Sequence, residues 1–136
     1  KAWIKTSRFT LVWRIVHQRI PTDNCLQTFG ITLCSKCRMC NQHREDLNHL
    51  FLSCDTASAL WHYILDIFEC RWLLFDTINM QIQKCLELST SQQIKNLFVA
   101  AVAELLHVIW YGRNELIFRT NSFKINAGKM RILMAI

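Results

Sequence analysis

The chain has 136 residues, of which 51% are hydrophobic, and it contains only three Gly and one Pro. This length suits one globular domain, and this composition excludes a disordered chain and favours packed helices. The net charge of +6 is uneven, because residues 1–20 carry +5, residues 111–136 carry +4 and the middle carries −3. Two basic ends permit a nucleic-acid partner without requiring one, since charged helix faces are usually just solvated.

The chain opens without a charged-then-apolar signal segment. Its longest apolar run, Leu97 to Trp110, is too short and too polar to span a bilayer, so we expect no membrane partner. Seven cysteines in a chain without a secretion signal favour free thiols in a reducing, intracellular compartment. Because the chain begins at Lys1 and stops inside an apolar segment, we expect it to be a piece of a longer protein.

The first predicted element is a helix from Thr6 to Ile20, which Pro21 ends. Apolar residues recur in it at steps of three and four, which places them on one face for packing in the core: Phe9, Val12, Trp13, Val16 and Ile20. Other faces carry Arg8, Arg14, His17 and Arg19. These basic side chains are either solvated or contact phosphates.

A short second helix is predicted after Pro21. Thr22-Asp23-Asn24 supplies side-chain acceptors that cap it, and its apolar side is formed by Cys25, Leu26 and Phe29. Gly30 is placed to end it in the left-handed conformation.

The next stretch contains the pattern Cys-x2-Cys-x8-His-x4-Cys, formed by Cys37, Cys40, His49 and Cys54. Three thiolates and one imidazole are the number and type of ligands that close a tetrahedral zinc site. A Cys-x2-Cys pair on a tight turn aims both sulfurs at one point, and His-x4-Cys returns two more ligands from a helical turn and its end. Four protein ligands leave no position for water, so the expected Zn²⁺ is structural rather than catalytic.

Alternatives to this ligand set remain open. If the pattern binds no zinc, its cysteines are buried thiols, or the four residues are the remnant of a site that no longer binds metal. Cys34 forms an overlapping Cys-x2-Cys pair with Cys37 and competes with Cys37 or Cys40, and His43 competes with His49. The remaining thiols, Cys25, Cys70 and Cys85, are expected in the core as small apolar residues.

Two more helices are predicted in the middle of the chain. Asp55-Thr56 caps a helix that runs to Phe68, and its Trp61 is expected to be a core residue that packs over the metal site. Residues 70–88 lack clean periodicity and are interpreted as a connection followed by a short helix from about Ile78 to Leu86.

The longest helix is predicted next. Thr90 and Gln93 match a capping box, and apolar residues then continue at helical spacing to Leu116, for about seven turns. Glu104 and His107 lie three residues apart in this helix. We interpret them as a contact within the helix or at its surface rather than as an acid/base pair. Asn121 or Ser122 caps a last helix that starts at about Phe123.

Several of these segments together resemble the zinc-binding domain of reverse transcriptases from plant non-LTR (LINE-type) retrotransposons. The resemblance runs from about Phe9 to Ile136 and rests on Trp13-Arg14, Arg19-Ile20-Pro21-Thr22-Asp23-Asn24-Cys25-Leu26, Gly30-Ile31, the Cys37-x2-Cys40 pair, Glu45, His49-Leu50-Phe51-Leu52-Ser53-Cys54, Trp61 and Ile109-Trp110-Tyr111-Gly112-Arg113-Asn114 with Phe118. It implies that Cys37, Cys40, His49 and Cys54 bind Zn²⁺ and that the chain is a non-catalytic helical module, C-terminal to a polymerase that is not in this sequence.

The predicted fold is mainly α: a small helical domain built around a Cys-Cys-His-Cys zinc knuckle at residues 1–69, with a helical extension at 70–136 that packs on it and contains the long C-terminal helix. The resemblance implies RNA or DNA as the partner during reverse transcription. Candidate phosphate contacts are Arg8, Arg14, Lys36, Arg38, Arg44 and Arg113, although for Arg113 hydrogen bonds that tie the long helix to its neighbours are preferred.

The alternative function is a domesticated remnant that serves as a structural or protein-interaction subunit of a larger assembly. A hydrophobic content of 51% and five tryptophans favour it, since a domain of this size cannot bury all of that surface. The expected compartment is the nucleus, or an organelle for a domesticated copy.

Overall fold

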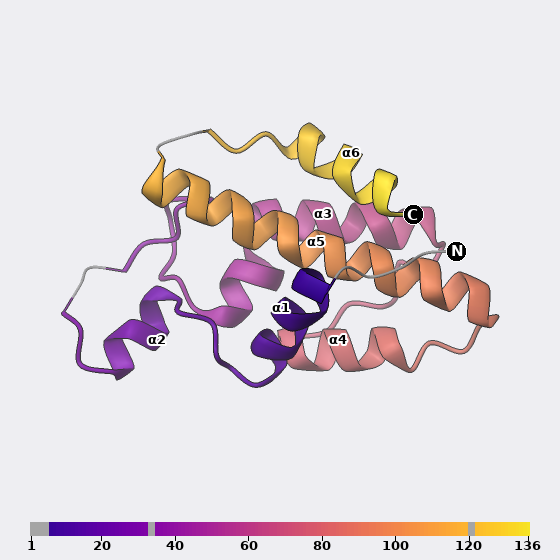
Figure 1. Ribbon diagram of the computed structural model, residues 1–136, viewed down its shortest axis with the longest axis horizontal. Helices are drawn as coiled ribbons and strands as arrows, with labels where there is room; N and C mark the ends of the chain where they lie inside the picture. Colours follow the sequence, from indigo (N-terminus) through magenta and orange to yellow (C-terminus); the bar gives the residue numbers. More distant parts are fainter. Residues whose placement is uncertain (1–5, 33–34, 120–121) are drawn as a thin grey trace.

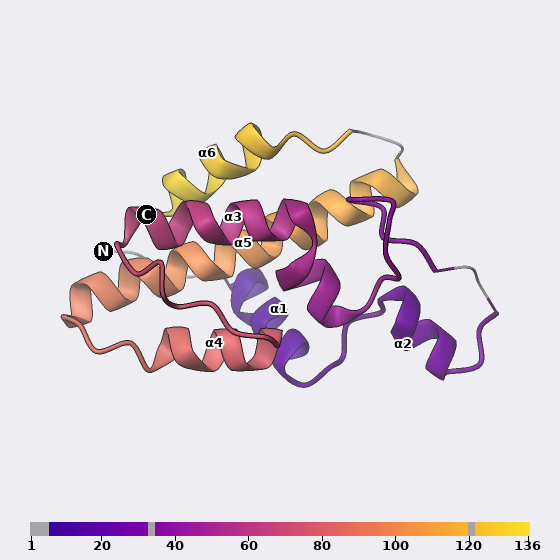
Figure 2. The same ribbon diagram turned by 180° about the vertical axis from the view of Figure 1, so that it is seen from behind.

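The computed structural model describes residues 6–32, 35–119 and 122–136, and all regular secondary structure in these ranges is helical. The mainly α fold class predicted from the sequence is confirmed. The long helix α5 (Gln92–Phe118) runs through the centre, with α3 (Asp55–Ile67) and α6 (Ile125–Ala135) along one side and α1 (Thr6–Val16) and α4 (Ile78–Leu86) along the other (Figures 1 and 2). The short helix α2 (Asp23–Thr28) lies at the end of the molecule near the C-terminus of α5.

Three helices begin at side-chain caps that the local sequence supplies. The hydroxyls of Thr22, Thr77 and Ser91 each accept a hydrogen bond from the backbone N–H three residues later, at the start of α2, α4 and α5. Each cap satisfies one of the N–H groups that a helix leaves unpaired at its N-terminus. Gly30, with φ +86°, lies in the left-handed region just after α2, as predicted.

Other predicted helix ends are wrong by a few residues. Helix α1 ends at Val16 rather than at Ile20, and Gln18 follows it with φ 55°. Ser91 rather than Thr90 caps α5, and α3 and α6 start after Cys54 and Lys124, neither of which makes a side-chain cap bond. Ser122 therefore does not cap α6, and Asn121 lies outside the described residues.

Helix α1 packs on α5 and α4, but only part of the predicted apolar set is in the core: Ile20 is buried and Val12 is packed against the core, as predicted. Its buried residues are Leu11 and Ile15. Phe9, Trp13 and Val16, predicted to be in the core, are 65%, 48% and 38% exposed. Apolar spacing identifies a stripe on a helix, but which side of the helix meets the core is decided by the neighbouring helices.

One hydrophobic core runs through both predicted parts of the chain. Its largest fully buried side chains include Trp61 of α3 and Phe98, Leu105 and Leu106 of α5, and it extends to Cys37 and Cys54. The helices of residues 70–136 thus pack on those of residues 1–69, while the boundary at residue 69 stays a prediction.

Helix α5 is longer than the apolar run at its centre and, by length and composition alone, could cross a membrane. In this structure, however, 56% of its most apolar window is buried inside the protein. A central helix of a packed domain meets the same test, so the absence of a membrane partner stays a prediction.

Candidate metal centre

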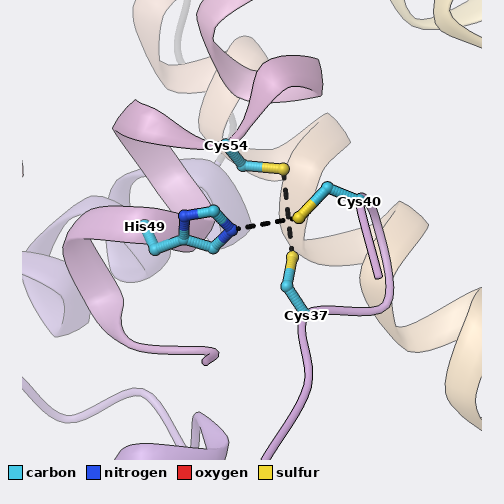
Figure 3. Close-up of side chains that lie close together, drawn as sticks. All are labelled: Cys37, Cys40, His49 and Cys54. Atoms are coloured by element: carbon cyan, nitrogen blue, oxygen red, sulfur yellow. Dashed lines mark hydrogen bonds between the residues drawn. The ribbon is translucent and has the colours of Figure 1, made fainter. Parts of the chain in front are cut away.

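The first two candidate ligands lie on a tight turn of the loop formed by residues 35–54, here called the knuckle loop. The N–H of Cys37 donates to the carbonyl of His43 at 2.7 Å, and the N–H of Asn41 donates to the carbonyl of Cys37 at 2.8 Å. Asn41 has φ 58°, a left-handed conformation that Asn tolerates better than most residues and that turns the chain back after Cys40. The turn brings the side chains of Cys37 and Cys40 to the same side, as the Cys-x2-Cys spacing predicts (Figure 3).

The other two candidate ligands flank the π-helical turn η1 (His49–Ser53). In an α-helix, residues five apart lie about 140° apart around the axis and cannot bind the same ion easily. A π-helical turn closes over five residues instead, and the N–H of Cys54 donates to the carbonyl of His49 at 2.7 Å. The wider turn thus brings the side chains of His49 and Cys54 to one side.

All four ligand atoms lie within 4.8 Å of one another. The Sγ atoms of Cys37 and Cys54 are 3.9 Å apart, and the Sγ of Cys40 is 3.3 Å from Nε2 of His49 (Figure 3). In a tetrahedral zinc site the same pairs of atoms would be about 3.8 Å and about 3.6 Å apart, given the usual Zn–S and Zn–N bond lengths. The arrangement therefore fits one zinc ion with small adjustments, and it leaves no open coordination position.

The contact between the two buried thiols shifts their pKa values in opposite directions. The hydrogen bond with Cys54 raises the pKa of Cys37 far above its usual value, and burial adds to the shift. The same contact with Cys37 lowers the pKa of Cys54, which also lies at the N-terminus of α3, where the helix dipole favours a thiolate. Burial, with the nearby His43, lowers the pKa of His49 and favours the neutral imidazole that metals bind.

Comparison with known protein families supports the resemblance for part of the chain. Residues 1–61 match the family described as zinc-binding in reverse transcriptase. This part of the chain is similar to the zinc-binding domains of reverse transcriptases. The resemblance found from the motifs is thereby confirmed at the level of the family, while the plant origin stays an expectation. No curated protein and no solved structure matches the chain.

The family and the cluster together make zinc the cofactor of this domain. Its ligand set of Cys37, Cys40, His49 and Cys54 is the one that the geometry supports. Of the two competitors, His43 has its ring centroid 5.0 Å from that of His49. It does not belong to the group of residues whose ligand atoms converge. Cys34 lies outside the described residues.

The other cysteines have different surroundings. Cys70 and Cys85 are buried as predicted, and Cys25 is half-buried. Burial raises the pKa of Cys85 to about 12, so this thiol stays protonated at neutral pH. The zinc-binding domain thus separates four metal-binding candidates from thiols that fill space.

The candidate phosphate contacts fall into two groups. Lys36, Arg38 and Arg44 are exposed on the knuckle loop, and Arg14 is half-exposed on α1. The side chains of Arg8 and Arg113 are instead only 13% and 5% exposed, and each pairs with a carboxylate, Glu104 or Glu45. We therefore remove Arg8 and Arg113 from the phosphate-binding set, since a buried guanidinium that is already paired has no surface for a phosphate.

Glu45 is the residue at this site whose role the sequence did not reveal. It is fully buried in the knuckle loop, and its carboxylate accepts two hydrogen bonds from Arg113 of α5. The available signals were an acidic residue inside the cysteine loop and the Arg113-Asn114 pair in the long helix. Nothing in the sequence joins the two, because they are 68 residues apart.

Proposed function

We propose that this zinc-binding domain holds nucleic acid as a non-catalytic accessory module of a reverse transcriptase. The observation that carries the proposal is the exposure of Lys36, Arg38 and Arg44 on the same loop that holds the zinc ligands. Within the described ranges, none of the three forms an ion pair with a carboxylate. Exposed cations without a carboxylate partner suit the phosphate backbone, since neutralising phosphates releases counterions.

Zinc supports this function without chemistry of its own. A closed set of three sulfurs and one nitrogen leaves no position for an activated water, so the ion stabilises the loop that presents the cations. Arg44 is oriented further by hydrogen bonds to the side-chain oxygens of Asn24 at 2.8 Å and Gln27 at 2.6 Å. The compartment proposed for this function is the nucleus.

A salt series measures the proposed contacts. Fluorescence anisotropy with a labelled single-stranded RNA would compare the wild type with a triple variant, Lys36→Gln, Arg38→Gln and Arg44→Gln. Each phosphate contact contributes about −0.7 to the slope of log affinity against log salt for single strands. Because the variant lacks three cations, its slope should be less negative than that of the wild type by about 2. A labelled DNA duplex of the same sequence tests RNA against DNA.

The matched control removes three cations at the other end of the molecule: Arg71→Gln, Lys84→Gln and Lys95→Gln. It changes the net charge by the same amount, and the ion pairs of Arg71 and Lys84 with Asp66 and Glu87 are exposed and worth little stability. Equal losses in both triple variants would mean that nucleic acid is attracted by net charge alone and would refute a specific site on the loop.

A second proposal is that the domain serves as a protein-interaction subunit. It is favoured by an apolar groove of about 200 Å³ between α1, α4 and α5, beside the exposed Phe9 and Trp13. Exposed apolar patches of this kind often mark contacts between proteins. The same salt series separates the proposals, because nucleic-acid binding that is absent or indifferent to salt would favour this second one.

A further inference from the structure

A buried ion pair joins the knuckle loop to the long helix α5. Glu45 lies between Cys40 and His49 and is fully buried. Its Oε2 accepts from Nε of Arg113 at 2.9 Å, and its Oε1 accepts from Nη2 of Arg113 at 2.6 Å and from the backbone N–H of Asp23 at 2.9 Å. Because a bidentate pair away from water has one favoured geometry, it fixes Glu45 relative to α5.

The backbone of Glu45 passes this constraint to the rest of the loop. Its carbonyl accepts from the N–H of Asn24 at 3.1 Å, and its N–H donates to Oγ of Ser35 at 2.9 Å. The next residue, Asp46, starts the turn that carries a zinc ligand, since its Oδ1 accepts from the N–H of His49 at 2.7 Å. The position of Glu45 thus sets where the turn with His49 begins.

Arg113 also lies near the other side of that turn. Its guanidinium stacks over the ring of Trp110 at 4.9 Å from the centroid, and the ring of Trp110 lies 6.3 Å from that of Phe51. Phe51 belongs to η1, between His49 and Cys54, and its carbonyl accepts from Nε1 of Trp61 at 2.7 Å. One segment of α5 therefore contacts the knuckle loop both before and within the turn that separates two ligands.

We propose that Arg113 and Glu45 are positioning residues of the zinc site: together they hold His49 and Cys54 at the distances that one zinc ion requires. This inference rests on the zinc site but not on the binding of nucleic acid. It also means that residues 1–61, the part that matches the family, depend on a residue of α5 for their full metal affinity.

The test compares two Arg–Glu pairs that both involve α5. Cobalt(II) would be titrated into the metal-free full chain and then displaced by zinc in competition with a chromophoric chelator, for the wild type, Arg113→Met, Arg113→Lys and Arg8→Met. Arg8 is the matched control, because it makes a similar bidentate pair with Glu104, at 2.9 and 3.3 Å, and neither residue belongs to the knuckle loop.

Loss of a partner that orients a metal ligand typically costs about 10–100-fold in metal affinity. We expect such a loss in Arg113→Met, with altered cobalt d–d bands that report a distorted site, and a smaller loss in Arg113→Lys. Arg8→Met should lower the melting temperature but keep zinc affinity within about twofold of the wild type. The reason is that the Arg8–Glu104 pair joins α1 to α5 and does not contact the knuckle loop.

Several results would overturn the proposal. Wild-type zinc affinity in Arg113→Met, or an equal loss in Arg8→Met, would show that the pair only stabilises the fold. If Arg113→Met does not fold, Arg113→Lys and Glu45→Gln decide by the same criterion, because both keep the size of the side chain. A wild type that binds neither cobalt nor zinc would overturn the zinc site itself, and the anisotropy series would still test nucleic-acid binding separately.

Discussion

The knuckle loop and the helical core are held together by different forces. The core formed by α3 and α5 consists of apolar side chains such as Trp61, Phe98 and Leu105, all with 0% exposure. The knuckle loop contains the tight turn at Cys37 and the short π-helical turn η1, and it depends on its four candidate ligands and on the hydrogen bonds of Glu45. Many small apolar contacts tolerate the loss of one, whereas a site with four ligands does not.

The largest expected effect follows from removing one ligand. Structural zinc in zinc-finger peptides binds with an apparent free energy of about 10–16 kcal/mol, more than any single core side chain contributes. In His49→Ala, elemental analysis should show the loss of bound zinc. Circular dichroism and limited proteolysis should show that the segment around residues 31–65 unfolds, and a chelator should do the same to the wild type.

His43→Ala is the control, because this second histidine lies beside His49 but outside the converging group. It should keep its zinc and its resistance to protease. Zinc lost from His43→Ala and kept by His49→Ala would mean that the ligand set is wrong.

A middle-sized effect is expected in the core. Phe98 is fully buried and its ring meets that of Phe68 edge to face, with centroids 5.0 Å apart. Phe98→Ala should lower the free energy of unfolding by about 3–5 kcal/mol, while the zinc content stays unchanged. Urea unfolding followed by circular dichroism measures the loss.

Trp13→Ala is the comparison for this variant, because Trp13 is a larger side chain but is 48% exposed. Its cost in unfolding free energy should be well below that of Phe98→Ala. A cost as large as that of Phe98 would show that α1 buries the face that the sequence predicted.

The smallest expected effect depends on pH. Burial raises the pKa of Cys85 from 9.0 to about 12, so the folded state keeps a proton that the unfolded state loses. The stability from this thiol is fully present below pH 9 and falls by up to about 1.4 kcal/mol per pH unit as the pH rises toward 12. Cys85→Ala should reduce this slope in urea unfolding between pH 8.5 and 10.5. Parallel slopes for both proteins would mean that the thiol ionises freely in the folded state.

Local features explain why part of the structure could be predicted. Cys37 and Cys40 converge because the Cys-x2-Cys spacing suits a tight turn, whereas His49 and Cys54 converge only because the turn between them is π-helical. The bounds of α4, Ile78–Leu86, agree with the prediction although this segment lacks clean periodicity, and its cap, Thr77, is a local signal that was not predicted. The π-helical form of η1 was not predicted, since a wider turn leaves no mark in the spacing of apolar residues.

The errors concern features that depend on distant residues. Phe9, Trp13 and Val16 share one face of α1, as predicted, but the buried residues of this helix are Leu11 and Ile15. Arg8 carries the same charge as Arg38, and only its partner 96 residues away removes it from the surface. For Arg113 the preferred hydrogen bonds to a neighbouring segment are found, with Glu45, 68 residues away.

The sequence by itself thus determined the converging group of candidate ligands, the helical class and most helix starts, because spacing and capping act over a few residues. Only the tertiary structure decided which arginines are buried, which face of α1 is covered and how Glu45 meets Arg113. Burial and charge pairing result from contacts between segments that are far apart in the chain, and no local pattern specifies them.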